Sequence, residues 1–172
     1  MKRLIIVSIL LLIAAFTYRS FGSAETATGT LTLTQPAPAP GDRAPGFTTR
    51  TAQGETFALS DRGVYVLVFW STLNEGSHKM EPGFQDLANE YANEEASFAA
   101  VYVNSIPEES GAPYASLRDG NGKLTSRYNV KRVPRIFLIK GGDVEMVWNG
   151  YYDGIEDDLK TYLDDALENR SQ

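Results

Sequence analysis

The chain has 172 residues, 42% of them apolar, a net charge of −6 at pH 7 and no cysteine. Its length and apolar content are sufficient for one domain with a substantial core, stabilised by packing rather than by disulfides. The negative charge argues against binding to nucleic acid or to an anionic lipid surface, because both need a positive field.

The N-terminal segment, residues 1–24, indicates a signal peptide or a membrane anchor. Lys2 and Arg3 precede the apolar run 4–16, and the small residues 22–24 follow where a signal peptidase would cut. The apolar run is shorter than the roughly 17–25 residues of a comfortable spanning helix, so cleavage is favoured and an uncleaved anchor remains open. Either form predicts an extracytoplasmic domain.

A linker rich in threonine, alanine and proline follows at residues 25–40. Its composition favours an extended, polyproline-like conformation. A folded domain is then expected over residues 41–170.

The folded part is predicted to open with a hairpin around Gln53-Gly54. The run VYVLVFW at 64–70 is continuously apolar, which is typical of a strand covered on both faces. Apolar residues at helical spacing predict a helix over 77–94, with Pro82 either in its first turn or at a kink. SFAAVYV at 97–103 indicates a second buried strand, parallel to the first.

The second half of the domain is less regular at its start. Residues 106–124 form an irregular stretch with one short helix expected at 114–117, and residues 123–130 add a helical turn. RIFLI at 135–139 is a third buried run, typical of a strand.

An antiparallel strand and a helix are expected to end the domain. DVEMVW at 143–148 alternates, which places Val144, Met146 and Trp148 on one face. The amphipathic helix 155–167 follows, with Asp153 as its expected N-cap. The predicted fold class is therefore α/β, a mixed central sheet flanked by helices with an additional N-terminal β-hairpin.

Three stretches resemble one protein family. GDRAPGFTTRTAQGETFALSD (41–61), VLVFWST (66–72) and YNVKRVPRIFLIKGGDV (128–144) are similar to the TlpA/ResA-like extracytoplasmic thiol–disulfide oxidoreductases of the thioredoxin-like superfamily. The resemblance covers residues 41–168 and implies a thioredoxin fold.

The chain departs from this family at the reactive centre. The family's Cys-x-x-Cys pair falls on Asn74 and Ser77, so these are degenerate active-site positions. Thiol–disulfide exchange requires a thiolate and a resolving thiol, and this chain has neither. Asn74 is a good N-cap, and Glu75 suits the positive end of a helix. We therefore expect that capping residues replace the cysteines, and we expect no metal and no cofactor.

The peptide bond between Val133 and Pro134 is the second feature that the resemblance implies. In the family this bond is cis and faces the cysteines, and the residue before the proline pairs its backbone with an extended peptide substrate. Such pairing needs no sulfur. The alternative is that Pro134 only shapes the loop.

These features predict a redox-inactive protein that binds an extended peptide or a partner protein of the cell envelope. The expected groove is lined by the following residues: Leu73, Asn74, Glu75, Val133 and Pro134. The resemblance suggests an accessory role in envelope thiol–disulfide homeostasis or cytochrome c maturation. Two alternatives stay open, a non-thiol enzyme that uses Glu75 and Ser77 and a purely structural subunit. The enzyme alternative predicts a raised pKa of Glu75 in a closed pocket.

Overall fold

A computed structural model describes residues 36–93, 96–106 and 111–168 of the chain. The signal or anchor segment expected at 1–24 and most of the linker expected at 25–40 lie outside these residues. Within the described ranges, no helix is long and apolar enough to cross a membrane.

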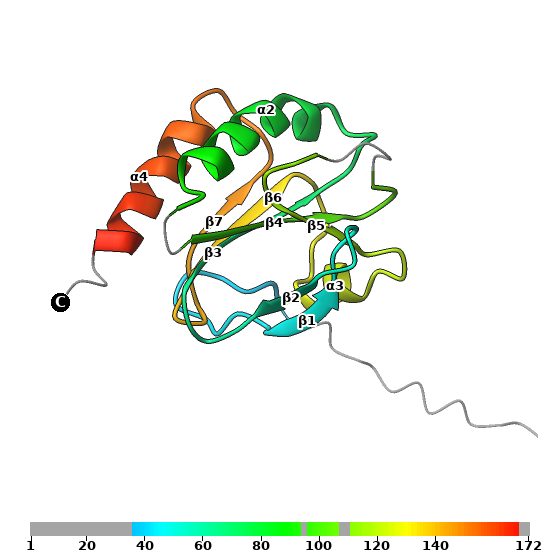
Figure 1. Cartoon of the computed structure of the whole chain (residues 1–172), viewed down its shortest axis with the longest axis horizontal. Helices are drawn as coiled ribbons and strands as arrows, with labels where there is room; N and C mark the ends of the chain where they lie inside the picture. Colours follow the sequence, from blue (N-terminus) through cyan, green and yellow to red (C-terminus); the bar gives the residue numbers. More distant parts are fainter. Residues whose placement is uncertain (1–35, 94–95, 107–110, 169–172) are drawn as a thin grey trace, which may run out of the picture. The chain divides into compact units, whose positions relative to one another are not determined.

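A five-stranded mixed sheet forms the centre of the domain, in the order β5-β4-β3-β6-β7 (Figure 1). Its strands have these bounds: β3 (Val64–Trp70), β4 (Ala96–Tyr102), β5 (Ala115–Arg118), β6 (Arg135–Lys140) and β7 (Asp143–Asn149). β3 pairs with β4 in parallel and with β6 antiparallel. β3 thus lies in the middle of the sheet, and all seven of its residues are buried, as its continuous apolar run predicted.

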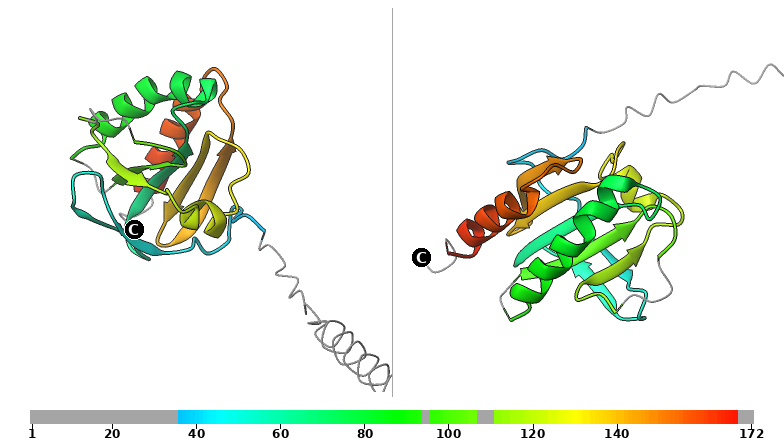
Figure 2. Two further views of the ribbon diagram at one scale, coloured as in Figure 1. Left: turned by 90° about the vertical axis from the view of Figure 1, so that its right-hand side faces the viewer. Right: turned by 90° about the horizontal axis from the view of Figure 1, so that it is seen from above.

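Helices and a hairpin cover the two faces of the sheet. Helices α2 (Glu75–Glu90) and α4 (Ile155–Glu168) pack on one face. The hairpin of β1 (Phe47–Arg50) and β2 (Thr56–Leu59) lies on the other face, together with the short helix α3 (Lys123–Arg127) (Figures 1 and 2). The predicted fold class is confirmed, including the additional N-terminal hairpin.

β5 corrects one prediction, because residues 114–117 were expected to be helical. Residues Ala115–Arg118 instead form an edge strand, in which Ala115 aligns with Ala99 of β4. Leu117 is fully buried and Ser116 is fully enclosed with it. The long-range pairing with β4 therefore overrides the weak local helical pattern.

A β-bulge in the pairing of β6 and β7 corrects a second prediction. Leu138 pairs with Met146 but Ile139 pairs with Val144, so one residue of β7 is left over. Val144 therefore belongs to the core on the hairpin face, whereas Trp148 lies in the core under α2 and α4. Val144 and Trp148, which were expected on one face of β7, therefore lie on opposite faces of the sheet.

The two long helices begin where local chemistry sets them. α2 begins at Glu75, two residues before the predicted start, and it continues through Pro82. α4 begins at Ile155, and Gly154, at φ +94°, occupies the position before it. The prediction that Asp153 directly caps α4 was therefore wrong, because the left-handed conformation needed at residue 154 favours glycine there.

Candidate functional site

The loop between β3 and α2 is held in place by hydrogen bonds. The Leu73 N–H donates to Ser71 Oγ at 3.1 Å. The Thr72 N–H donates to Asn104 Oδ1 at 3.2 Å, and Asn104 Nδ2 donates back to Thr72 Oγ1 at 2.6 Å. Because Asn104 follows β4, the loop is fixed to the neighbouring strand as well as to itself.

Asn74 caps α2, as its sequence position predicted. Its backbone is extended, and its Oδ1 accepts hydrogen bonds from the Ser77 N–H at 2.9 Å and from the Ser77 hydroxyl at 3.1 Å. Ser77 Oγ in turn accepts from the Ser71 N–H at 3.3 Å, and Ser77 is only 4% exposed. Asn74 and Ser77 therefore form a closed capping unit at the start of α2.

Asn74→Ala is expected to lower the free energy of unfolding by about 1 kcal/mol, because the first turn of α2 loses its side-chain acceptor. Asn74→Asp is the matched control, since its carboxylate oxygen can accept the same hydrogen bonds as the amide oxygen of Asn74. Urea denaturation of both variants measures the difference. Equal losses in the two variants would show that the cap does not stabilise the helix start.

Glu75 is the first residue of α2 and forms an exposed ion pair with Lys79 one turn later. The Lys79 ammonium donates to Glu75 Oε1 at 2.8 Å, and this hydrogen bond lowers the pKa of Glu75. The same bond raises the pKa of Lys79. The carboxylate is therefore held in its ionised form at the positive end of the helix.

The lowered pKa of Glu75 and the raised pKa of Lys79 determine how the stability from this ion pair depends on pH. The contribution of Glu75 is present above its pKa in the unfolded chain and is lost as pH falls through its lowered pKa in the fold. The contribution of Lys79 is present below its unfolded pKa and is lost as pH rises through its raised one. An NMR titration should find the Glu75 pKa below that of a free glutamate, and Lys79→Met should bring it back. An unchanged Glu75 pKa in Lys79→Met would contradict the pairing.

Pro134 lies against the start of α2. A Cβ placed on Gly76 would be 3.2 Å from Pro134 Cδ, 3.2 Å from Tyr151 Cβ and 3.3 Å from Asn74 Oδ1. The Val133–Pro134 peptide bond is cis. The structure therefore brings residues 74–77 and 133–134 together, and the absence of a side chain at residue 76 permits the close approach.

Val133 lies two residues before the start of β6, outside the sheet ladder. The ladder between β3 and β6 ends at Arg135, and the Pro134 carbonyl accepts from the Gly150 N–H at 2.8 Å. Among the described residues, no hydrogen bond engages the N–H or C=O of Val133. One donor and one acceptor of the main chain thus remain open beside the start of α2.

Leu73 is the residue of this loop that stands out into solvent. It is 87% exposed, far more than any other large apolar residue in the described part of the chain. Exposed single leucines are common, but this one directly precedes the capping residue Asn74. It adds an apolar contact point to the site.

Among the described residues, the cavity at this site is too small to enclose a substrate. The cavity next to Ser77 and His78 measures about 10 Å³, which is about the space of one water molecule. His78 makes a 2.8 Å hydrogen bond through Nε2 with the Thr72 carbonyl. His78 therefore helps to hold the loop in place. Ser77 Oγ forms hydrogen bonds with Asn74 and Ser71.

The sequence of residues 40–146 matches the AhpC/TSA family, over more than half of the chain. The chain belongs to the AhpC/TSA family. A search of curated proteins by sequence finds no match.

Solved structures similar to this AhpC/TSA chain have thioredoxin-like folds. A candidate thiol:disulfide interchange protein DsbE from Chlorobium tepidum is 23% identical over 76% of this chain and 99% of that chain, with a TM-score of 0.68. StoA from Bacillus subtilis is 20% identical over 72% and 99%, with a TM-score of 0.60. A secreted disulfide oxidoreductase from Mycobacterium tuberculosis is 21% identical over 67% and 92%, with a TM-score of 0.54. At these identities the likeness establishes the fold.

Sequence reasoning missed several residues that build the site of this AhpC/TSA chain. Gly76 and Tyr151 pack at the start of α2, and Asn104 holds the loop. An asparagine directly after a predicted strand is a weak signal for such a loop contact. The sequence offers no signal for Tyr151, because its contact depends on how the β7–α4 connection folds back.

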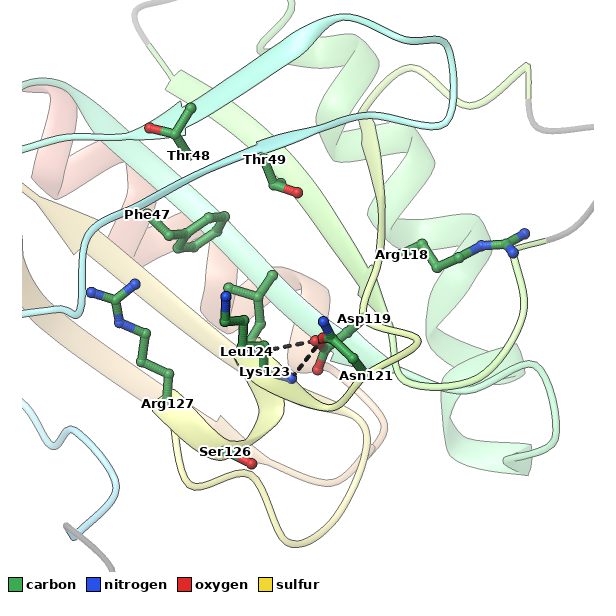
Figure 3. Close-up of a pocket in the computed structure, with 10 residues that line it drawn as sticks. All are labelled: Phe47, Thr48, Thr49, Arg118, Asp119, Asn121, Lys123, Leu124, Ser126 and Arg127. Atoms are coloured by element: carbon green, nitrogen blue, oxygen red, sulfur yellow. Dashed lines mark hydrogen bonds between the residues drawn. The ribbon is translucent and has the colours of Figure 1, made fainter.

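A larger, open cavity of about 690 Å³ lies between β1 and α3 of the AhpC/TSA domain (Figure 3). Figure 3 shows Arg118 at one end of this cavity and Arg127 at the other. The Asp119 carboxylate is buried and accepts from the backbone N–H groups of Leu124 and Thr125 at 2.9 and 2.7 Å. Asp119 thus holds the start of α3.

Proposed function

We propose that this AhpC/TSA-family chain is a redox-inactive, extracytoplasmic thioredoxin-like protein of the TlpA/ResA type. In this proposal it binds an extended peptide or a partner protein in the groove that the family uses for thiol chemistry. The groove is formed by the loop of Leu73, the capped start of α2, and Val133 with Pro134.

The open main-chain groups of Val133 carry this proposal. They lie beside a helix start that Asn74 and Ser77 fix, against which Pro134 packs. An incoming extended strand can pair with such groups, because main-chain pairing supplies affinity without any reactive side chain. Leu73 offers the partner an apolar contact at the same place.

The geometry favours binding over a non-thiol enzyme. An enzyme that uses Glu75 as an acid or base requires a raised pKa in a closed pocket, whereas the Lys79 hydrogen bond lowers this pKa and the carboxylate is exposed. Ser77 Oγ needs a neighbouring base to act as a nucleophile, but it accepts from the Ser71 backbone N–H and donates to the Asn74 amide oxygen.

The cellular setting in this proposal is the envelope. The N-terminal segment has the composition of a signal or anchor, and one similar structure is that of a secreted disulfide oxidoreductase. An accessory role in thiol–disulfide homeostasis or cytochrome c maturation fits the families of the similar structures, since such a chain can hold a client without exchanging electrons.

Val133→Asp tests the groove. Affinity capture from envelope extracts with the purified domain should recover a partner that Val133→Asp no longer retains, because the new negative charge beside the open main-chain groups disfavours strand pairing there. Thr56→Asp on β2 is the matched control, with the same introduced charge on the hairpin. Equal recovery by Val133→Asp and the wild-type domain would reject groove binding.

A further inference from the structure

A basic segment, residues 118–135, leads into the groove. It carries six cationic side chains and a single acidic one, Asp119, within a chain whose net charge is −6. The six cations are Arg118, Lys123, Arg127, Lys131, Arg132 and Arg135. The rest of the chain is therefore strongly acidic, and the positive charge is concentrated in one stretch.

The end of the basic segment is anchored by buried residues. Tyr128 is fully buried, and its hydroxyl donates to the Pro45 carbonyl at 3.0 Å. Val130 is also buried, and its N–H donates to the Thr125 carbonyl at 2.9 Å. Lys131 and Arg132 follow as exposed residues directly before Val133. Their backbone is thus held in place next to the open main-chain groups.

The cations of the basic segment are not neutralised within the fold. The ion pairs among the described residues involve Arg43, Lys79 and Lys160 as their cations, and none involves this segment. The Asp119 carboxylate is already occupied by the N–H groups at the start of α3. Lys131 and Arg132 are therefore exposed cations without an ion-pair partner among the described residues.

Arg135, the first residue of β6, has a partly buried guanidinium group next to an aromatic ring. Its guanidinium carbon lies 5.1 Å from the centroid of the Phe137 ring, and its Nε is buried without a hydrogen-bond partner among the described residues. A buried donor without an acceptor is unusual, and it lies one residue beyond Pro134.

We propose that the extended partner segment that pairs with Val133 is acidic. This inference rests on the proposed function and adds the chemistry of its ligand. A strand paired with Val133 presents alternate side chains to the groove, and the flanking side chains decide which sequences are accepted. Lys131 and Arg132 meet its carboxylates, while the acidic remainder of the molecule repels them from other surfaces.

The test compares two synthetic peptides on the full-length chain by isothermal titration calorimetry. The acidic probe is a blocked octapeptide of alternating threonine and glutamate, and the basic probe has lysine in place of glutamate. The acidic probe should bind at least about tenfold more tightly at low salt, since two favourable contacts near 0.7 kcal/mol each amount to that factor. This preference should shrink in 0.5 M salt.

Charge reversal makes the test specific. Lys131→Glu with Arg132→Glu should reverse the preference, so that the lysine probe binds more tightly. Arg50→Glu with Arg62→Glu is the matched control, because it makes the same change of charge at exposed positions on the hairpin and in the turn after β2. The control should keep the wild-type preference.

The outcomes separate this inference from the proposed function. If Val133→Asp abolishes binding of both probes while the Lys131 and Arg132 reversal changes nothing, groove binding stands and the acidic preference is wrong. If neither probe binds, or Val133→Asp has no effect, both proposals fall. Binding to anionic phospholipid vesicles that depends on Lys131 and Arg132, without peptide binding, would also overturn the inference.

Discussion

Asn74→Cys together with Ser77→Cys is expected to give the chain, which has no cysteine, a thiol-dependent disulfide reductase activity. Asn74 is the N-cap of α2, and Ser77 lies three residues later. Gly76, between them, lies against Pro134. A helix N-terminus stabilises a thiolate, and a second thiol three residues on can resolve the mixed disulfide. Reduction of insulin by dithiothreitol, followed by turbidity, measures the gain.

The two single variants, Asn74→Cys and Ser77→Cys, are the controls for this gain. Each has one thiol and cannot close a disulfide within the site, so neither should turn over. Circular dichroism should show that the double variant keeps its fold. A folded double variant that forms no 74–77 disulfide and reduces no insulin would show that these positions do not correspond to the family's cysteine pair.

Trp70→Ala is expected to lower the free energy of unfolding by about 3–5 kcal/mol. Trp70 ends β3 and is 2% exposed. Its ring packs edge-on with the rings of Phe84, Tyr102 and Tyr114, at centroid distances of 5.4, 5.6 and 5.6 Å. Alanine leaves a cavity between β3 and α2, and this loss is a large part of the stability of an ordinary domain. Urea denaturation measures it.

Leu73→Ala is the matched contrast, because it truncates another large apolar side chain three residues later. Leu73 is 87% exposed, so its truncation should change the free energy of unfolding by less than about 0.5 kcal/mol. The same variant should weaken partner capture if Leu73 contacts the partner. Similar losses of stability in Trp70→Ala and Leu73→Ala would contradict the burial of Trp70.

The central part of the fold follows from local patterns in the sequence. β3 and β6 are short, continuous apolar runs, and burial on both faces of a sheet is the simplest way to hide such runs from water. The spacing of Met80, Phe84 and Leu87 similarly requires one buried face of α2. These elements were predicted because their own residues determine them.

β5 and the bulge of β7 depend on contacts that local patterns do not encode. Four residues of β5 gain their strand conformation from pairing with β4, and the short run contains no alternation that identifies it. In β7, the extra residue between Val144 and Met146 transfers Val144 to the other face. A single unpaired residue moves the side chains that precede it in the strand to the opposite face of the sheet. The alternating sequence pattern does not reveal such a bulge.

The candidate site also combines a feature that local sequence predicts with contacts that only the fold creates. The cap formed by Asn74 was predicted because an N-cap acts within four residues. The contact of Gly76 with Pro134 and Tyr151 joins segments about 60 and 75 residues apart along the chain, and only the folded chain brings them together. Whether Val133 has a partner strand stays a prediction.

The capping unit of Asn74 and Ser77 also bears on how the lineage can change. A single mutation toward cysteine at either position replaces one member of a mutually hydrogen-bonded pair and supplies no resolving thiol. Each single variant is expected to have a less stable helix start and only one thiol, so selection for thiol–disulfide exchange has nothing to act on until both positions have changed. The hydrogen bond from the Ser77 hydroxyl to Asn74 Oδ1 thereby favours retention of the cysteine-free sequence.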